Sequence, residues 1–210
     1  ITDGVGSSSE SFVYGAGSHS ATAGEEASFF IQAVDAQGHP RRDSGDTFNV
    51  SIAGPAVVDT LVLYSGNGTY RVTYIPILAG WYNLTVFLVE DGVSTQLPLP
   101  PPSRIYVRPS VPIAHSSRIL HEDSEVEAGS ESRVELHLHD EFGNPLESGG
   151  ELVQTVWTGS DGLQAVNFAH VADHGDGSYT ATWTPTRVDT YTVVTAAAEH
   201  ALAATYFEAN

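Results

Sequence analysis

The sequence contains no cysteine, no methionine and no lysine among its 210 residues, and all eight basic residues are arginine. The absence of cysteine excludes a disulfide framework and a thiolate zinc site, and it leaves the redox compartment undecided. Long hydrophobic runs are also absent, since none approaches the roughly 20 apolar residues of a membrane-spanning helix. We therefore expect a fold stabilised by its apolar core, without direct membrane insertion.

Positive charge is scarce throughout the chain. Twenty-six acidic residues face eight arginines, which gives a formal net charge of −18. A balance this negative repels polyanions, so neither nucleic acid nor an anionic membrane is expected as a partner. The sequence begins at Ile1 and contains no Met, so we expect it to be part of a longer protein.

What the chain does contain is an internal repeat. The letters D-A-Q-G-H-P at 35–40 return as D-E-F-G-N-P at 140–145, and G-N-G-T-Y at 66–70 returns as G-D-G-S-Y at 175–179. A fixed period of about 105 residues indicates two copies of one domain. Division at this period predicts one domain at 1–109 and a second at 110–210, joined by a short proline-containing linker.

Apolar residues alternate with polar ones in short runs, as at Phe48, Val50 and Ile52. This period of two is typical of strands with one buried face, and the prolines and glycines between the runs favour turns. The pattern predicts an all-β protein of two tandem, seven-stranded β-sandwiches. The clearest strands are expected at 27–34, 48–52, 60–64, 70–74, 82–86 and 104–108, and in the second copy at 133–139, 153–157, 166–171, 179–183, 191–193 and 201–207.

Several blocks in order give each copy a resemblance to the immunoglobulin-like repeats of the filamin (filamin/ABP280 repeat) family. They are A-G-E at 23–25, A-V-D-A-Q-G at 33–38, I-A-G-P at 52–55 and the turn-and-tyrosine block at 66–82. The second copy departs from the pattern at Ser130 and Asp189. The resemblance covers nearly the whole chain, and it implies non-catalytic modules that act as spacers, self-association units and docking sites, with no enzyme activity and no cofactor.

In that family a partner peptide adds as an extra strand along the third strand of the repeat. The resemblance places the receiving edges at residues 46–52 and 151–157, where the alternative interpretation is a merely exposed edge. We predict the second copy as the docking repeat, with an edge formed by Glu151, Leu152, Val153, Gln154, Thr155, Val156 and Trp157.

The choice of the second copy depends on three N-x-S/T sequons at Asn49, Asn67 and Asn83, all in the first copy. Asn49 and Asn83 fall on outward phases of their expected strands, where a glycan has room. The alternative is that these sequons arise by chance in a chain rich in Ser and Thr. If Asn49 carries a glycan, its bulk obstructs strand addition to the first copy.

No pattern indicates a metal or a catalytic site. His137 and His139 share one face of a strand but lack a third ligand, and the acidic stretch at 122–127 matches no calcium loop. No arrangement of Ser, His and Asp favours an enzyme. We therefore expect no metal, no cofactor and no catalysis.

Two settings remain for the pair. The clustered sequons favour a fragment of a cell-surface or extracellular glycoprotein that serves adhesion or structural assembly by binding proteins or neighbouring repeats. The alternative is an intracellular cytoskeletal or ciliary scaffold of filamin type. A more distant third possibility, a glycan-binding module or a domain appended to an enzyme, needs aromatic rings on an outer face, and the phases of Tyr70, Tyr74, Tyr179 and Trp183 point inward.

Overall fold

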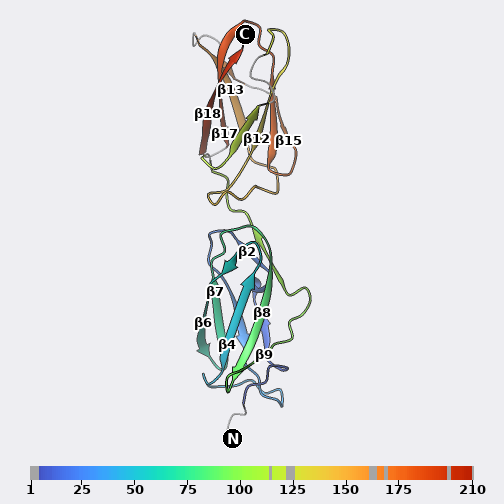
Figure 1. Cartoon of the computed structure of the whole chain (residues 1–210), viewed down its shortest axis with the longest axis vertical. Helices are drawn as coiled ribbons and strands as arrows, with labels where there is room; N and C mark the ends of the chain where they lie inside the picture. The colour runs from blue at the N-terminus through green and yellow to red at the C-terminus, as the bar shows by residue number, and fades with distance from the viewer. Residues whose placement is uncertain are drawn as a thin grey trace. The chain divides into compact units, whose positions relative to one another are not determined.

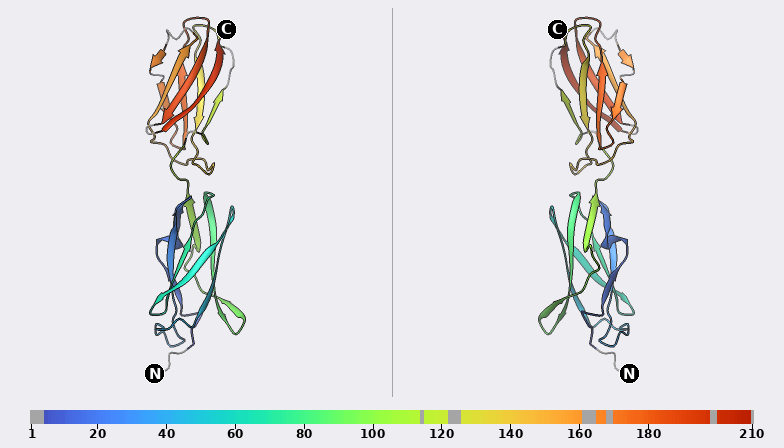
Figure 2. Two further views of the ribbon diagram at one scale, coloured as in Figure 1. Left: turned by 90° about the vertical axis from the view of Figure 1, so that its left-hand side faces the viewer. Right: turned by 90° about the vertical axis from the view of Figure 1, so that its right-hand side faces the viewer.

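The computed structural model describes residues 5–113, 115–121, 126–160, 165–167, 170–197 and 200–209. The chain divides into two compact units, Ile1–Arg108 and Pro109–Asn210 (Figure 1). Each unit is a sandwich of two β-sheets, and the two layers of strands are visible from both sides in Figure 2. Among the described residues, no helix has the length and apolar character needed to cross a membrane.

The first unit consists of a four-stranded sheet facing a larger one. The four-stranded sheet has the order β1 (Phe12–Tyr14), β3 (Ala27–Gln32), β7 (Thr69–Tyr74) and β6 (Thr60–Gly66). The larger sheet has the order β2 (Ser20–Thr22), β10 (Arg104–Arg108), β8 (Gly80–Glu90), β4 (Thr47–Ala53) and β5 (Val57–Val58), and β9 (Val93–Gln96) extends β8 as a hairpin. A 3₁₀ turn, η1 (Ala16–Ser18), separates β1 from β2.

The second unit repeats this arrangement with two four-stranded sheets. One has the order β11 (Arg118–His121), β12 (Ser132–His137), β16 (Ser178–Trp183) and β15 (His170–Asp173). The other has the order β14 (Ala165–Asn167), β13 (Val153–Gly159), β17 (Asp189–Ala197) and β18 (His200–Ala209). The expected all-β tandem of sandwiches is therefore confirmed.

The period-two pattern accounts for the core of each unit. In β4, Phe48, Val50 and Ile52 are buried while Thr47, Asn49 and Ser51 are exposed. Apolar area removed from water contributes roughly 25 cal/mol per Å², so this alternation determines which face of each strand packs inward. The same phase buries the aromatic side chains of the later strands, including Tyr70, Tyr74, Tyr82, Tyr179 and Tyr191.

One predicted strand was wrong. A single strand was expected at 166–171, but β14 pairs with β13 in one sheet whereas β15 pairs with β16 in the other. The chain therefore changes sheets within the expected strand. The interval between Gly159 and Gly175, which contains this segment, is four residues longer than the matching interval between Gly54 and Gly66. Apolar alternation does not show where a strand switches layers.

Hydrogen bonds repeat between the units along with the strands. The Tyr70 hydroxyl accepts a bond from the backbone N–H of Asp46 (3.1 Å), and the Tyr179 hydroxyl accepts one from the N–H of Glu151 (3.0 Å). The turn that carries the most obvious sequence repeat is also shared. One carboxylate oxygen of Asp35 accepts bonds from two backbone N–H groups of its turn, and Asp140 does the same.

The units differ beneath this turn. Arg41 is buried in the first unit and its Nε lies 2.7 Å from Oδ2 of Asp46, which is also buried. At the corresponding places the second unit has Leu146 and the exposed Glu151. The backbone approaches these positions closely in both units, because a Cβ on Gly68 or Gly177 would lie within 2.5 Å of the carbonyl oxygen of Arg41 or Leu146.

Candidate interaction edges

The edge of β4 has a stretch without a second strand partner. All seven residues of β4 pair with β8, but β5 pairs on the other side only with Ile52 and Ala53. In the described part of the first unit, no strand covers residues 47–51 on that side. A strand edge of this kind presents free N–H and C=O groups to another chain.

The hydrogen bonds show which backbone groups face outward. The Val50 carbonyl accepts a bond from Thr60 Oγ1 (3.2 Å), so it points away from β8. Because the direction of backbone groups alternates along an antiparallel strand, Phe48 also presents its N–H and C=O on this side. The open edge therefore offers the backbone groups of Phe48 and the N–H of Val50, next to the hydroxyl of Thr60.

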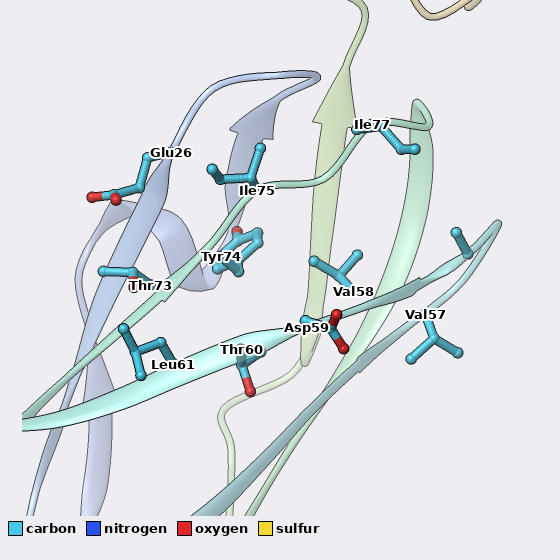
Figure 3. A pocket seen from close by; sticks show the side chains of 11 residues that line it. Glu26, Val57, Val58, Asp59, Thr60, Leu61, Thr73, Tyr74, Ile75 and Ile77 are labelled. Atoms are coloured by element: carbon cyan, nitrogen blue, oxygen red, sulfur yellow. The ribbon is translucent and has the colours of Figure 1, made fainter.

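An apolar groove of about 470 Å³ is lined by β5 and by residues of β6, β7 and the β7–β8 connection, and none of its lining residues belongs to β4. Two parts of this lining also contact β4. Thr60 donates a hydrogen bond to the Val50 carbonyl, and β5 pairs with Ile52 and Ala53. Figure 3 shows side chains of the β5–β6 segment on one side of the groove and of the β7–β8 connection on the other. Its exposed apolar side chains are Val57, Leu61, Ile75 and Ile77, with Glu26 and Asp59 at the rim.

All three sequon asparagines are exposed in the structure. Asn49 lies on β4 between the buried Phe48 and Val50, and Asn83 lies on β8. Asn67 occupies the β6–β7 turn with a φ of 52°, where its carbonyl accepts a bond from Gln32 Nε2 (3.2 Å). Each site has room for a glycan, and glycosylation stays a prediction.

The edge predicted in the second unit is partly covered. β14 pairs with Val156 and Trp157, and the Trp157 side chain lies in the core. Within the described residues, 151–155 have no strand on that side. Leu152 is exposed there, whereas the Thr155 hydroxyl is buried against Thr195. The docking role of residues 151–157 stays a prediction.

No group of three or more potential metal-ligating side chains was found in the part of the chain that the structure describes. His137 Nε2 lies 3.7 Å from Glu135 Oε2, and His139 Nδ1 is in hydrogen-bonding distance of the His137 carbonyl. These contacts are local to one strand. Residues 122–125 of the acidic stretch lie outside the described residues.

The sequence interpretation missed one surface feature, the contact between Trp81 on β8 and Tyr106 on β10. The two residues are register partners on the outer face of the larger sheet. The strand was expected to begin at Tyr82, one residue too late to include Trp81. The alternation around Tyr106, between the buried Ile105 and Val107, was the available signal.

Comparison with protein families gives one match to each unit. The filamin/ABP280 repeat model matches residues 5–96, and the model of invasin domain 3 matches residues 114–206. The first unit therefore matches a filamin-type, immunoglobulin-like repeat, and the second unit matches a domain of invasin. The recognition from sequence is confirmed, and the second repeat is the one that a bacterial invasin model describes. These families consist of structural and adhesion domains rather than enzymes.

Solved structures with the same fold include three bacterial proteins. The Escherichia coli adhesin FdeC matches all of this chain with a TM-score of 0.62 at 20% identity. Invasin, a bacterial integrin-binding protein, matches 99% with a TM-score of 0.62 at 14% identity, and Yersinia pseudotuberculosis InvD matches 97% with a TM-score of 0.56 at 17% identity. The chain spans 66%, 41% and 59% of those proteins, respectively. At these identities the similarity shows the shared fold.

Proposed function

We propose that this tandem pair is a non-catalytic module of a cell-surface or extracellular repeat protein, which associates with other proteins through the edges of its sandwiches. The observation that carries the proposal is the open edge of β4, where Phe48 and Val50 present backbone groups beside an apolar groove. Strand addition needs these two features, since backbone hydrogen bonds give affinity and pockets for side chains give specificity. The adhesin neighbours support an adhesive setting for the same fold.

Glycosylation decides which repeat is available. Asn49 lies in the middle of the open edge of β4, so a glycan there obstructs a partner strand and leaves the predicted edge of β13 for docking. Without that glycan, β4 is the longer open edge, because its uncovered residues 47–51 all belong to the strand, whereas β13 begins only at Val153.

Mass spectrometry of the chain from its natural source tests this setting. We expect the intact mass to fall on enzymatic deglycosylation and the modified sites to map to Asn49 or Asn83, because both side chains are exposed. Modification at Asn67, which lies in a turn, can be compared with modification at the two strand sites in the same sample. An unmodified mass at all three sites would favour the intracellular cytoskeletal or ciliary scaffold.

A proline in the edge tests the binding mode on unglycosylated protein. Val50→Pro removes the outward N–H, which makes no bond to β8, but it also changes a buried side chain, so its NMR spectrum must first show a folded first unit. Peptides selected from an extended-peptide library should then bind at least about tenfold more weakly. The matched control is Val153→Pro, which blocks the edge of β13 instead. Equal binding of every selected peptide to both variants and to the parent chain would contradict strand addition.

A further inference from the structure

The larger sheet of the first unit carries an aromatic pair on its outer face. The rings of Trp81 and Tyr106 have their centroids 4.7 Å apart with an interplanar angle of 44°. Trp81 is the second residue of β8 and is 58% exposed, whereas the next residue, Tyr82, is fully buried. A large aromatic ring in this position contributes little to the core, so its exposure indicates a binding surface.

Compact side chains lie next to the aromatic pair. On the β4 side, the register that pairs Ala53 with Asn83 places Pro55 opposite Trp81. On the opposite side β2 places Ser20 beside Tyr106, and Ser20 is exposed. Rings flanked by compact and hydroxyl-bearing side chains form a shallow platform rather than a closed pocket.

Two arginines flank the platform. Arg104 and Arg108 lie two residues on either side of Tyr106 in β10, and strand alternation places all three side chains on one face. Both arginines are exposed, and neither has an ion-pair partner within the described residues. Arg108 borders a pocket together with Glu25 and Glu26, whereas Arg104 lies opposite the neutral Asn83. Arg104 is therefore the better anchor for an anion.

We propose that this face binds an acidic oligosaccharide of a partner, with a sugar ring on Trp81 and Tyr106 and a uronate carboxylate on Arg104. The aromatic faces match the apolar faces of pyranose rings, and the guanidinium matches a carboxylate in a paired, charge-assisted hydrogen bond. Because the net charge of −18 repels extended polyanions, we expect only short acidic chains to reach Arg104. This role is independent of the strand-edge function, and it requires that Asn83, which pairs with Arg104 and lies on the same face as Trp81, carries no glycan.

The experiment is an NMR titration of the unglycosylated full chain, followed at the tryptophan indole N–H signals. The probes are the hexasaccharide of polygalacturonate and, as the neutral match, maltohexaose. We expect a saturable shift of the Trp81 signal with the acidic probe, no shift of the buried Trp157 signal, and at least about tenfold weaker binding of maltohexaose.

Matched variants assign the contacts. Trp81→Ala and Arg104→Gln should each weaken binding of the acidic hexasaccharide about tenfold, since a hydrogen bond to a charged group or a lost stacking ring is worth this much. The control is Arg71→Gln, an exposed arginine on the other sheet that pairs with Glu26. If Trp81→Ala alters the fold, Arg104→Gln still tests the proposal, because it changes only an exposed side chain.

Three results would overturn the proposal. They are the absence of a saturable Trp81 shift with the acidic hexasaccharide, equal affinity for the neutral one, and an affinity that Arg104→Gln leaves unchanged. A Trp81 shift seen only in chain glycosylated at Asn83, and lost in Asn83→Gln, would also overturn it. That result would assign the platform to the protein's own glycan, because Asn83 lies on the same face of β8.

Discussion

Arg41→Leu should destabilise the first unit by about 3–5 kcal/mol, because it leaves the Asp46 carboxylate buried without its cation. The Arg41 side chain is 9% exposed and that of Asp46 is 4% exposed, and their closest atoms are 2.7 Å apart. Arg41 also binds Asp43 at 2.7 Å, but Asp43 is largely exposed and keeps its hydration after the change.

The second unit supplies the control for this prediction. It has Leu146 where the first has Arg41, so leucine fits the space beside the same backbone turn. The double variant Arg41→Leu/Asp46→Asn removes both charges and should recover at least half of the loss, about 2 kcal/mol. Urea unfolding of the full chain, followed by residue-resolved NMR, measures both units in one sample. A loss below about 1 kcal/mol would contradict the importance of the buried pair.

The loss in Arg41→Leu should also depend on pH. Burial raises the pKa of Asp46, and Arg41 opposes this effect. Without Arg41 the folded-state pKa of Asp46 moves further above its unfolded value, so the folded variant binds a proton more readily than the unfolded chain. Its stability therefore falls as the pH rises through the interval between the two pKa values. At a pH below the unfolded pKa of Asp46, the difference from the parent chain should become small.

Trp157→Ala should destabilise the second unit by about 3–5 kcal/mol, which is a large part of the stability of a small domain. Trp157 is 2% exposed and packs in one core cluster with Val134, Ala181 and Val193. Its ring also stacks at 5.7 Å on that of Trp183. The cavity left by the ring cannot be refilled by the strands around it, because β13 is paired on both sides at this position.

The exposed Trp81 is the matched control for Trp157. Trp81→Ala removes the same side chain from a surface and should cost less than about 1 kcal/mol. Midpoints of urea unfolding, resolved for each unit, give both values. Equal losses in the two variants would mean that Trp157 does not support the core as its burial indicates.

The sequence was sufficient for the fold because alternation, proline and glycine turns and the repeat all indicate the same architecture. Where strands pair was harder to predict. The apolar phase of β4 identified Asn49 as an outward residue, but it did not show that β5 ends after covering Ile52 and Ala53. An open edge depends on the length of the neighbouring strand, which local sequence does not determine.

The aromatic platform escaped prediction for a similar reason. Trp81 and Tyr106 are 25 positions apart in the sequence, and only the register between β8 and β10 places them side by side. The predicted inward phase was correct for Tyr70, Tyr74 and Tyr179, which are buried. The outer-face aromatic rings that a glycan-binding module needs therefore lie on a different strand pair from those considered in the sequence, and glycan binding stays a proposal.

The most direct test of the proposed function is a crystal structure of the unglycosylated chain with a selected peptide. We predict that the peptide lies as an added strand along residues 47–51 of β4, with hydrogen bonds to the backbone of Phe48 and Val50 and a side chain in the groove of Leu61 and Ile75. A peptide bound elsewhere on either unit, with the edges of β4 and β13 left open, would contradict association through the sheet edges.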